Sequence, residues 1–356
     1  MFVLGACVNL MAGSVPQDSQ TGVRPEKADE RERAMFLLKR MALVVMLSGL
    51  SETAIAQQTP PPAEPSMHTE PWWNSKYGEA DTLGAVNNLS AKGVKDAAKL
   101  IKTGKTYALG VPTSPEGAAY GNRTYQVERT PGPNADFTSN GTQRVTSFDE
   151  KITTSMGIGT QIDGLAHLGV DHHYYNGITG KEVATSRVLQ PADIPPIVTR
   201  GVLLDMTKHY KKASLEVGDM YNKAEIVAAA KAQKVSIGKG DVVLFHTGWM
   251  AAKMASDKDT YRRTEPGLGE EGAQYLADLG VVAVGSDTIA LEALPSPPGK
   301  TFIVHQTLLA KNGVHVLETI NTNELAADAV SEFMFVLGIP KLVGTVQMVI
   351  NPIAIR

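Results

Sequence analysis

Short apolar runs separated by helix-like segments constrain the fold of this chain more than any other feature. Residues 197–206, 241–245 and 281–284 are rich in aliphatic and β-branched side chains. A strand that is apolar at consecutive positions is buried on both faces of its sheet. Because helical patterns alternate with these runs, the sequence predicts a mixed α/β fold whose strands are covered by helices or by a second sheet.

Capping residues mark the ends of several predicted helices. Ser90 precedes an amphipathic run that stops at Gly104, Asn222 precedes a run through Gln233, and residues 270–279 end before Gly280. Ser and Asn accept hydrogen bonds from free N–H groups at a helix start, and Gly tolerates the left-handed turn at a helix end. The other predicted elements are strands at 105–111, 314–317 and 341–350, helices at 305–310 and 324–337, and a long Gly/Pro-rich connection at 112–140 that is typical of functional or disordered loops.

The N-terminal region has the composition of a leader sequence. Residues 35–56 contain Lys39 and Arg40, then an apolar run at 41–50, and then a small-residue cleavage site at 54–56. This order is typical of a secretory signal peptide, and the apolar run is too short to span a bilayer. We therefore predict a periplasmic or secreted protein with no membrane segment after cleavage.

The same reading divides the chain into segments. Residues 1–34 form an overlong N-terminal extension if translation begins at Met35, and residues 57–70 are a Pro-rich linker. Residues 71–356 show no repeat, charge block or composition shift. They are predicted to form a single catalytic domain.

Composition and missing motifs exclude several classes of function. A net charge of −3 and a pI near 6.3 give no basic patch for nucleic acid. The only cysteine, Cys7, precedes the predicted cleavage site, so the exported chain would have no disulfide, thiolate nucleophile or cysteine-bound zinc. No P-loop, dinucleotide fingerprint, GxSxG or HExxH motif is present either.

Carboxylates and histidines in the glycine-rich stretch 155–177 point to a metal. Asp163 and His167 lie there, and His305 with Glu318 forms a second candidate cluster. Glycines let the backbone approach a ligand, while imidazole and carboxylate groups bind divalent ions and move protons. Such an ion polarises a carbonyl and lowers the pKa of water toward ~7. The residues therefore predict a metal that activates water.

The motifs around these residues resemble those of the cyclase family, which includes bacterial kynurenine formamidases and isatin hydrolases. Its members carry HxGTHxDxPxH, and residues 157–167 (GIGTQIDGLAH) align with it without a gap. Residues 241–249 (DVVLFHTGW) resemble GDVVLxRTGW, residues 284–288 (VGSDT) resemble VGTDT, and residues 304–320 (VHQTLLAKNGVHVLETI) resemble PxHxxLLxxxGIxxxENL. The resemblance covers nearly all of the chain after the linker.

The resemblance implies a set of site residues. The positions of the family's metal ligands are Gly157, Gln161, Asp163, His305 and Glu318, and the position of its catalytic histidine is His167. Gly157 has no side chain to ligate, and Gln161 offers an amide oxygen in place of imidazole, a change typical of a longer subgroup with GTQxD. We therefore expect one divalent ion, Mn²⁺ or Zn²⁺, bound by Gln161, Asp163, His305 and Glu318. For Gln161 the alternative is a buried amide that braces the loop.

Candidate pocket residues flank this set. Trp72, Trp73, His172, His173, Tyr174 and His246 are predicted to line the substrate pocket. The alternatives are core packing for the tryptophans, a solvated loop for residues 172–174 and a strand end for His246. Further pocket residues are expected from the connection at 112–140.

The resulting functional hypothesis is a metal-dependent amidohydrolase. It would cleave a non-peptide C–N bond in a small cyclic amide or aryl formamide, with His167 as the general base. A lactonase or other ester hydrolase is the first alternative, and a ligand-binding descendant without the full metal site is the second. The resemblance also implies a mixed sheet or β-barrel-like core surrounded by helices, assembled as a homodimer or homotetramer.

Overall fold

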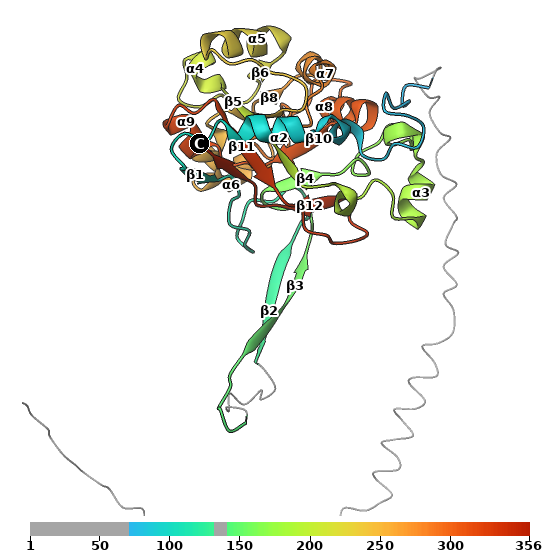
Figure 1. Ribbon diagram of the computed structural model, residues 1–356, viewed down its shortest axis with the longest axis vertical. Helices are drawn as coiled ribbons and strands as arrows, with labels where there is room; N and C mark the ends of the chain where they lie inside the picture. The colour runs from blue at the N-terminus through green and yellow to red at the C-terminus, as the bar shows by residue number, and fades with distance from the viewer. Residues whose placement is uncertain (1–70, 132–140) are drawn as a thin grey trace, which may run out of the picture. The chain divides into compact units, whose positions relative to one another are not determined.

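A nine-stranded sheet of mixed direction forms the centre of the protein (Figure 1). The computed structural model describes residues 71–131 and 141–356. The predicted extension, signal peptide and linker at 1–34, 35–56 and 57–70 lie outside the described residues. In spatial order the strands are β1 (Thr106–Ala108), β13 (Ile353–Ile355), β11 (Glu332–Leu337), β5 (Ile197–Asp205), β7 (Val242–His246), β9 (Ala283–Ser286), β10 (His315–Glu318), β4 (Gln161–Asp163) and β12 (Gln347–Val349).

The apolar runs found in the sequence are the parallel strands in the middle of this sheet. β5 pairs with β7, β7 with β9 and β9 with β10, all in parallel. Successive side chains on a strand point to opposite faces. Thus Val243 and Phe245 pack into a first hydrophobic cluster on one face of the sheet, and Val242 and Leu244 pack into a second cluster on the other face. Burial on both faces explains why these strands are apolar at consecutive positions.

The sheet curls into a half-barrel. The second cluster contains Tyr107 and Ala354 from one end of the strand order, and also Ile162 and Met348 from the other end. Strands that are far apart in the sheet share a core only when the sheet bends toward itself. The prediction of a mixed α/β fold with a barrel-like core surrounded by helices is therefore confirmed.

The two longest helices cover the outer face of the curled sheet. The longest, α5 (Lys223–Ala232) and α7 (Glu270–Leu279), bury Ile226 and Leu276 against the strands of the first cluster. The others are α2 (Ala91–Ala98), α3 (Gly180–Thr185), α4 (Met206–Tyr210), α6 (Lys258–Tyr261), α8 (Ile303–His305) and α9 (Asn323–Ala327), with 3-10 turns at Gly84–Asn88, Tyr175–Gly177 and Pro191–Asp193 and π-helical turns at Met250–Met254 and Gln306–Lys311. Among the described residues, no helix is long and apolar enough to cross a membrane.

The predicted helix at 324–337 is wrong over its second half. Only α9 is helical there, and β11 follows as a strand between β13 and β5. Its side chains alternate, with Phe333, Phe335 and Leu337 buried and their neighbours half-buried. This period of two, together with the aromatic residues, fits a sheet better than a helix. The predicted strand at 341–350 is likewise reduced to β12, and β13 follows it.

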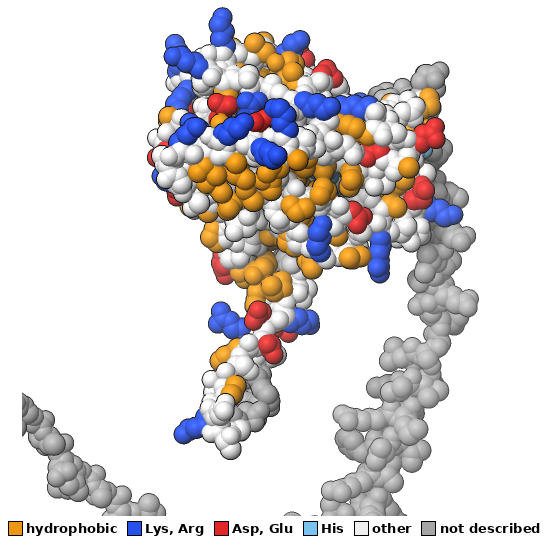
Figure 2. All heavy atoms as spheres, in the orientation of Figure 1, with side chains coloured by type: hydrophobic (Ala, Val, Ile, Leu, Met, Phe, Trp, Pro, Cys, Tyr) orange, Lys and Arg blue, Asp and Glu red, His pale blue; other side chains and the backbone are white. Residues whose placement is uncertain are grey.

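A β-hairpin occupies part of the predicted connection at 112–140. β2 (Tyr125–Pro131) pairs with β3 (Phe148–Thr154), and residues 132–140 lie outside the described residues. Val127 faces Ile152 across the hairpin, and both side chains are exposed, as Figure 2 shows for hydrophobic side chains along the hairpin. A further short pair, β6 (Met220–Tyr221) with β8 (Gly267–Leu268), lies outside the main sheet. The connection therefore has more structure than a loop.

Asp81 ties the segment before α2 to the 3-10 turn at Tyr175–Gly177. Its carboxylate accepts hydrogen bonds from Ser75 Oγ at 3.0 Å, Leu83 N at 3.1 Å, Asn87 Nδ2 at 2.7 Å and Tyr175 Oη at 2.7 Å. Burial opposes the charged form, but these donors outweigh it and lower the pKa of Asp81. The folded protein therefore prefers the ionised carboxylate.

We expect Asp81→Asn to lower the free energy of unfolding by roughly 1–3 kcal/mol near pH 7, because the buried Tyr175 and its partly buried neighbours lose a charged acceptor. A folded-state pKa below the ordinary value contributes stability that is present above the ordinary pKa and lost as the pH falls. The difference between wild type and variant in thermal midpoint should therefore shrink from pH 7 toward pH 3. A difference that stays constant over this range would contradict the assignment.

Candidate metal centre and active site

The register of β4 with its two neighbours brings together the polar side chains at the centre of the site. Gln161 pairs with Glu318 of β10, and Asp163 pairs with Gln347 of β12. All four side chains lie on one face of the sheet, because alternate residues of β4 share a face and paired residues face the same way. Ile162, which lies between Gln161 and Asp163, points to the other face and packs into the second hydrophobic cluster. The motif GTQID thus delivers two polar groups to one side.

His305, at the end of α8, completes a buried cluster with these strands. Its Nε2 lies 3.1 Å from Glu318 Oε1 and 3.5 Å from Asp163 Oδ2. Asp163, His305 and Glu318 each offer a ligand atom, and these atoms lie within 4.8 Å of one another. The structure therefore brings together the three predicted ligands with ionisable side chains.

The other ring nitrogen of His305 is held by Glu292. His305 Nδ1 lies 2.6 Å from Glu292 Oε1, and the backbone N–H of His305 donates to the same oxygen at 3.1 Å. A carboxylate on the distal nitrogen fixes the orientation and tautomer of a histidine ligand and raises its basicity. The ring is therefore already oriented with Nε2 toward Asp163 and Glu318.

Asp163 is fully buried and has an oxygen with no hydrogen-bond partner. Its Oδ1 accepts from Gln347 Nε2 at 2.7 Å and from Gln161 Nε2 at 3.3 Å. Within the described residues no donor satisfies its Oδ2. A buried carboxylate oxygen without a partner is costly unless another group binds it. This oxygen points toward the ring nitrogens of His305 and His167, where a cation would satisfy it.

Electrostatics around the cluster favour a cation. Burial and the Asp163 carboxylate raise the pKa of Glu318. Burial also opposes ionisation of Asp163, but His167 and His305 outweigh it and hold the pKa of Asp163 below its usual range. Burial opposes the charged form of His305 as well, yet its three carboxylate neighbours raise its pKa well above the usual range. A surplus of negative charge is therefore gathered around one histidine.

The donor set fits a divalent metal ion. One imidazole nitrogen and two carboxylate oxygens suit ions such as Mn²⁺ and Zn²⁺. Three protein ligands also leave coordination positions open, as catalytic sites require. Asp163, His305 and Glu318 are the residues that would hold the ion.

The side chain of Gln161 lies between the carboxylates of Asp163 and Glu318 and presents its amide nitrogen, not its oxygen, to them. Its amide nitrogen donates to Glu318 Oε2 and to Asp163 Oδ1. The side chain therefore braces the cluster in this structure, which matches the alternative considered for Gln161. Its role as a metal ligand stays a prediction and would require the amide to turn its oxygen toward the ion.

His167 faces a small cavity above the cluster. Its Nε2 lies 3.9 Å from Asp163 Oδ2, and its side chain is 23% exposed. The cavity has a volume of about 230 Å³ and is lined by Tyr120, Arg123, His167, Leu168, Ile289, Ala290, Phe302, His305 and Glu318. Burial lowers the pKa of His167 despite the nearby Asp163. A neutral imidazole at the cavity wall is suited to accept a proton.

The other predicted pocket residues lie outside this cavity. Trp73 stacks on His173 with ring centroids 4.3 Å apart, and Trp72 packs edge-on against Trp73 at 5.4 Å. His172 is exposed, and Tyr174 is half-buried against the first cluster. The two tryptophans and His173 thus pack among themselves, and none of the five residues lines the cavity that contains His167. Their contact with substrate stays a prediction.

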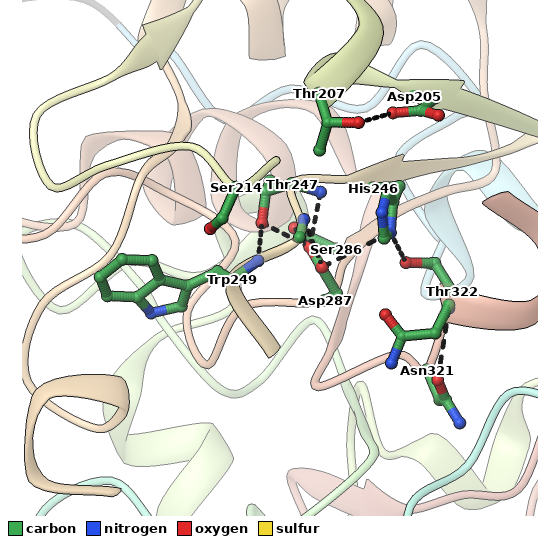
Figure 3. Close-up of polar contacts among 12 residues, drawn as sticks. Asp205, Thr207, Ser214, His246, Thr247, Trp249, Ser286, Asp287, Asn321 and Thr322 are labelled. Carbon is green, nitrogen blue, oxygen red and sulfur yellow. Dashed lines mark hydrogen bonds and ion pairs between the residues drawn. The ribbon is translucent and has the colours of Figure 1, made fainter. Parts of the chain in front are cut away.

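His246 belongs to a separate buried polar network at the ends of β5, β7 and β9 (Figure 3). Its Nδ1 lies 2.8 Å from Thr322 Oγ1 and 3.6 Å from Asp287 Oδ2. Asp287 in turn accepts hydrogen bonds from Thr247 N, Thr247 Oγ1 and Gly248 N at 2.9, 2.6 and 2.9 Å. These bonds anchor the turn after β7, so the strand-end alternative describes the contacts of His246 better than a pocket wall.

Sequence reasoning missed several residues around the site. Glu292 and Gln347 hold His305 and Asp163, while Tyr120, Arg123 and Phe302 line the cavity. A signal existed for Glu292, since a lone carboxylate in the apolar run IALEAL needs a buried partner. Tyr120 and Arg123 come from the connection at 112–140, which was expected to supply pocket residues without naming them.

Comparison with known families identifies the class of protein. The Cyclase family model matches residues 69–293, which is more than half of the chain. The chain therefore belongs to the cyclase family. A comparison with curated proteins finds no match.

Solved structures share the fold over most of their length. A crystal structure described as a novel cyclase is 25% identical, with a TM-score of 0.72 over 80% of this chain and 100% of that chain. Isatin hydrolase A from Labrenzia aggregata, bound to benzyl benzoate, is 15% identical, with a TM-score of 0.54 over 70% of this chain and 93% of that chain. Isatin hydrolase A from Ralstonia solanacearum is 17% identical, with a TM-score of 0.53 over 71% of this chain and 92% of that chain.

Proposed function

We propose that this protein is a metal-dependent hydrolase that cleaves a non-peptide C–N bond in a small cyclic amide or aryl formamide. The observation that carries the proposal is the buried cluster of Asp163, His305 and Glu318 below a cavity that His167 lines. The motif resemblance to formamidases and isatin hydrolases supports the class of bond.

The residues have distinct tasks in the proposed reaction. A divalent ion bound by the cluster would supply polarisation of the carbonyl and activation of water. His167 accepts a proton from the attacking water, whose oxygen forms a bond to the carbonyl carbon. The C–N bond then breaks, and the departing nitrogen takes the proton from His167. Glu292 keeps His305 in place throughout, and the apolar lining from Leu168, Ile289 and Phe302 limits access of bulk water.

An ester hydrolase is the second candidate. The same cluster and base would open a lactone, because the carbonyl of an ester reacts by the same addition and departure. The cavity of about 230 Å³ favours a small substrate for either bond. A ligand-binding protein without hydrolytic activity remains the contrasting hypothesis.

Two further proposals concern where the protein acts and how it assembles. We retain export to the periplasm or outside the cell, supported by the leader-like residues 35–56. We also retain a homodimer or homotetramer. The exposed pair of Val127 and Ile152 on the hairpin is compatible with such an assembly, since an isolated two-stranded hairpin is only marginally stable.

The function is tested by metal analysis and a hydrolysis screen. The purified chain, stripped with chelator and reloaded with Mn²⁺ or Zn²⁺, is offered cyclic amides, aryl formamides and lactones. We expect stoichiometric binding of one ion per chain and hydrolysis that chelator abolishes and metal restores. A protein that takes up no ion, or whose hydrolysis is the same with and without metal, would sink the proposal. Binding of these compounds without turnover would favour the non-hydrolytic alternative.

A further inference from the structure

Arg123 places a cation in the wall of the catalytic cavity. It follows Tyr120 in the connection before β2, and its guanidinium lies over the Tyr120 ring, 5.7 Å from the centroid. It lines the same cavity as His167, His305 and Glu318. The guanidinium therefore lies close to the groups of the proposed reaction.

Gly157 makes room for this guanidinium. A Cβ added at Gly157 would lie 2.7 Å from Arg123 Cζ and 2.5 Å from Gln347 Oε1. Any side chain at this position would displace Arg123 or Gln347, and Gln347 is needed to hold Asp163. The position where the resemblance implied a metal ligand is thus bordered by a fixed positive charge.

The guanidinium has no salt-bridge or hydrogen-bond partner among the described residues. Over residues 71–131 and 141–356, the side chain of Arg123 forms no ion pair and donates no hydrogen bond. An arginine presents five N–H donors in a planar fork that matches a carboxylate. Arg123 is half-buried and lines the cavity, and no acceptor of the protein occupies its N–H groups. Its guanidinium is therefore available to a ligand.

Further cations lie on the outer side of Arg123. A pocket of about 320 Å³ is lined by Arg123 together with Lys258 and Arg262, and Arg263 lines its neighbour beside Tyr120. The carboxylates of Glu116 and Asp259 also line the first of these pockets, and Asp259 pairs with Arg262 at 2.7 Å. The four cations of the two pockets still outnumber these two carboxylates. A cluster of one sign of charge raises the local concentration of ligands of the opposite sign. The part of the cavity wall around Arg123 and the neighbouring outer pockets therefore favour an anion.

We infer that Arg123 binds a carboxylate of the substrate, so that the substrate is a small amide or formamide with an apolar body and a carboxylate group. This inference rests on the proposed function, because it concerns the same cavity. Leu168, Ile289 and Phe302 would contact the apolar body, and Arg123 would form two parallel hydrogen bonds with the carboxylate. The scissile group would then lie toward His167.

The test measures ligand binding without turnover. Zn²⁺-loaded full-length protein is titrated with 4-fluorobenzoate and with its neutral counterpart 4-fluorobenzamide, and dissociation constants are obtained by fluorine NMR. We expect wild type to prefer the anion by about tenfold or more. Arg123→Gln should reduce this preference to within twofold and leave the benzamide affinity and the Zn²⁺ affinity unchanged. Arg123→Lys, which keeps the charge but loses the fork, should retain part of the preference.

Arg129→Gln on the exposed hairpin is the matched control and should keep the full preference. An equal affinity of wild type for both ligands would overturn the inference. A preference that survives in Arg123→Gln would do so as well, because the metal or another cation would then hold the carboxylate. A protein that hydrolyses nothing yet shows the Arg123-dependent preference would refute the proposed function alone. Hydrolysis of neutral amides without any Arg123 dependence would refute this inference alone.

Discussion

Asp163→Asn should remove most of the stabilisation of this protein by divalent metal ions. The replaced Oδ2 is fully buried and has no hydrogen-bond partner among the described residues, so a bound cation would satisfy it. Loss of supporting groups alone weakens metal binding about 10–100-fold, and loss of a ligand should cost roughly a hundredfold or more. At a metal concentration of about 100 times the wild-type Kd, the wild type gains about 2.7 kcal/mol and such a variant about 0.4 kcal/mol.

The measurement is thermal denaturation with and without Mn²⁺, together with metal content by mass spectrometry. The midpoint without metal should change little, because His305 keeps Glu292 and Glu318 as partners and Glu318 loses a like-charged neighbour. Asp205→Asn is the matched control. Asp205 is also buried, at the end of β5, but it bonds Thr207 and lies outside the cluster. The Asp205→Asn substitution should lower the thermal midpoint measured without metal, but Mn²⁺ should raise that midpoint by as much as it does in the wild type. A full metal shift in Asp163→Asn would exclude this residue as a ligand.

The central strands were predictable because burial on both faces leaves a direct mark in the sequence. Residues 241–245 and 281–284 became β7 and β9 with nearly the predicted bounds. The half-barrel was implied only by the family resemblance, since its curl depends on contacts between strands that are distant in sequence, such as Tyr107 and Ile162 in one core. Periodicity within a segment carries no information about such contacts.

The misassigned helix shows where local patterns compete. The sequence ELAADAV favours a helix, and the structure keeps one as far as Ala327. The following EFMFVL alternates on a period of two, but no Gly or Pro in the sequence marks the boundary between it and the helical part. Pairing of β11 with β5 and β13 decides the outcome, and that pairing is a tertiary effect.

The candidate site was predictable where motifs fix spacing and unpredictable where loops fold back. Asp163, His305 and Glu318 meet as their motif positions imply, because β4 and β10 are paired strands. Trp73 and His173 stack on each other and do not line the cavity that contains His167, so their contact with substrate stays a prediction. Arg123, in contrast, reaches the cavity from a connection that has no motif. Chain direction after a turn cannot be deduced from composition, so such residues need a structure.

Register also explains the supporting residues that sequence reasoning missed. Gln347 faces Asp163 because β12 pairs with β4 in one particular alignment, and a shift by one residue would turn its amide to the other face. A predicted strand at 341–350 gives no such register. The carboxylate of Glu292 likewise meets His305 only through folding of the segment before α8.

His167→Gln should lower kcat by roughly 10²–10⁴-fold while leaving the affinity for metal within about twofold of wild type, because a general base is lost and no ligand is removed. The histidine lines the cavity, and its Nε2 is 3.9 Å from Asp163 Oδ2. Glutamine retains a polar side chain of similar reach but cannot take up a proton at neutral pH. Steady-state kinetics on the substrates found in the screen and Mn²⁺ titration are compared for both proteins. His209→Gln, on α4 beside Tyr210, is the matched control and should change neither quantity.

If His167→Gln instead lost the metal and the activity together, His167 would be a ligand. If it kept full activity, the proposed mechanism would be wrong, because the described part of the cavity wall has no other neutral imidazole to accept the proton.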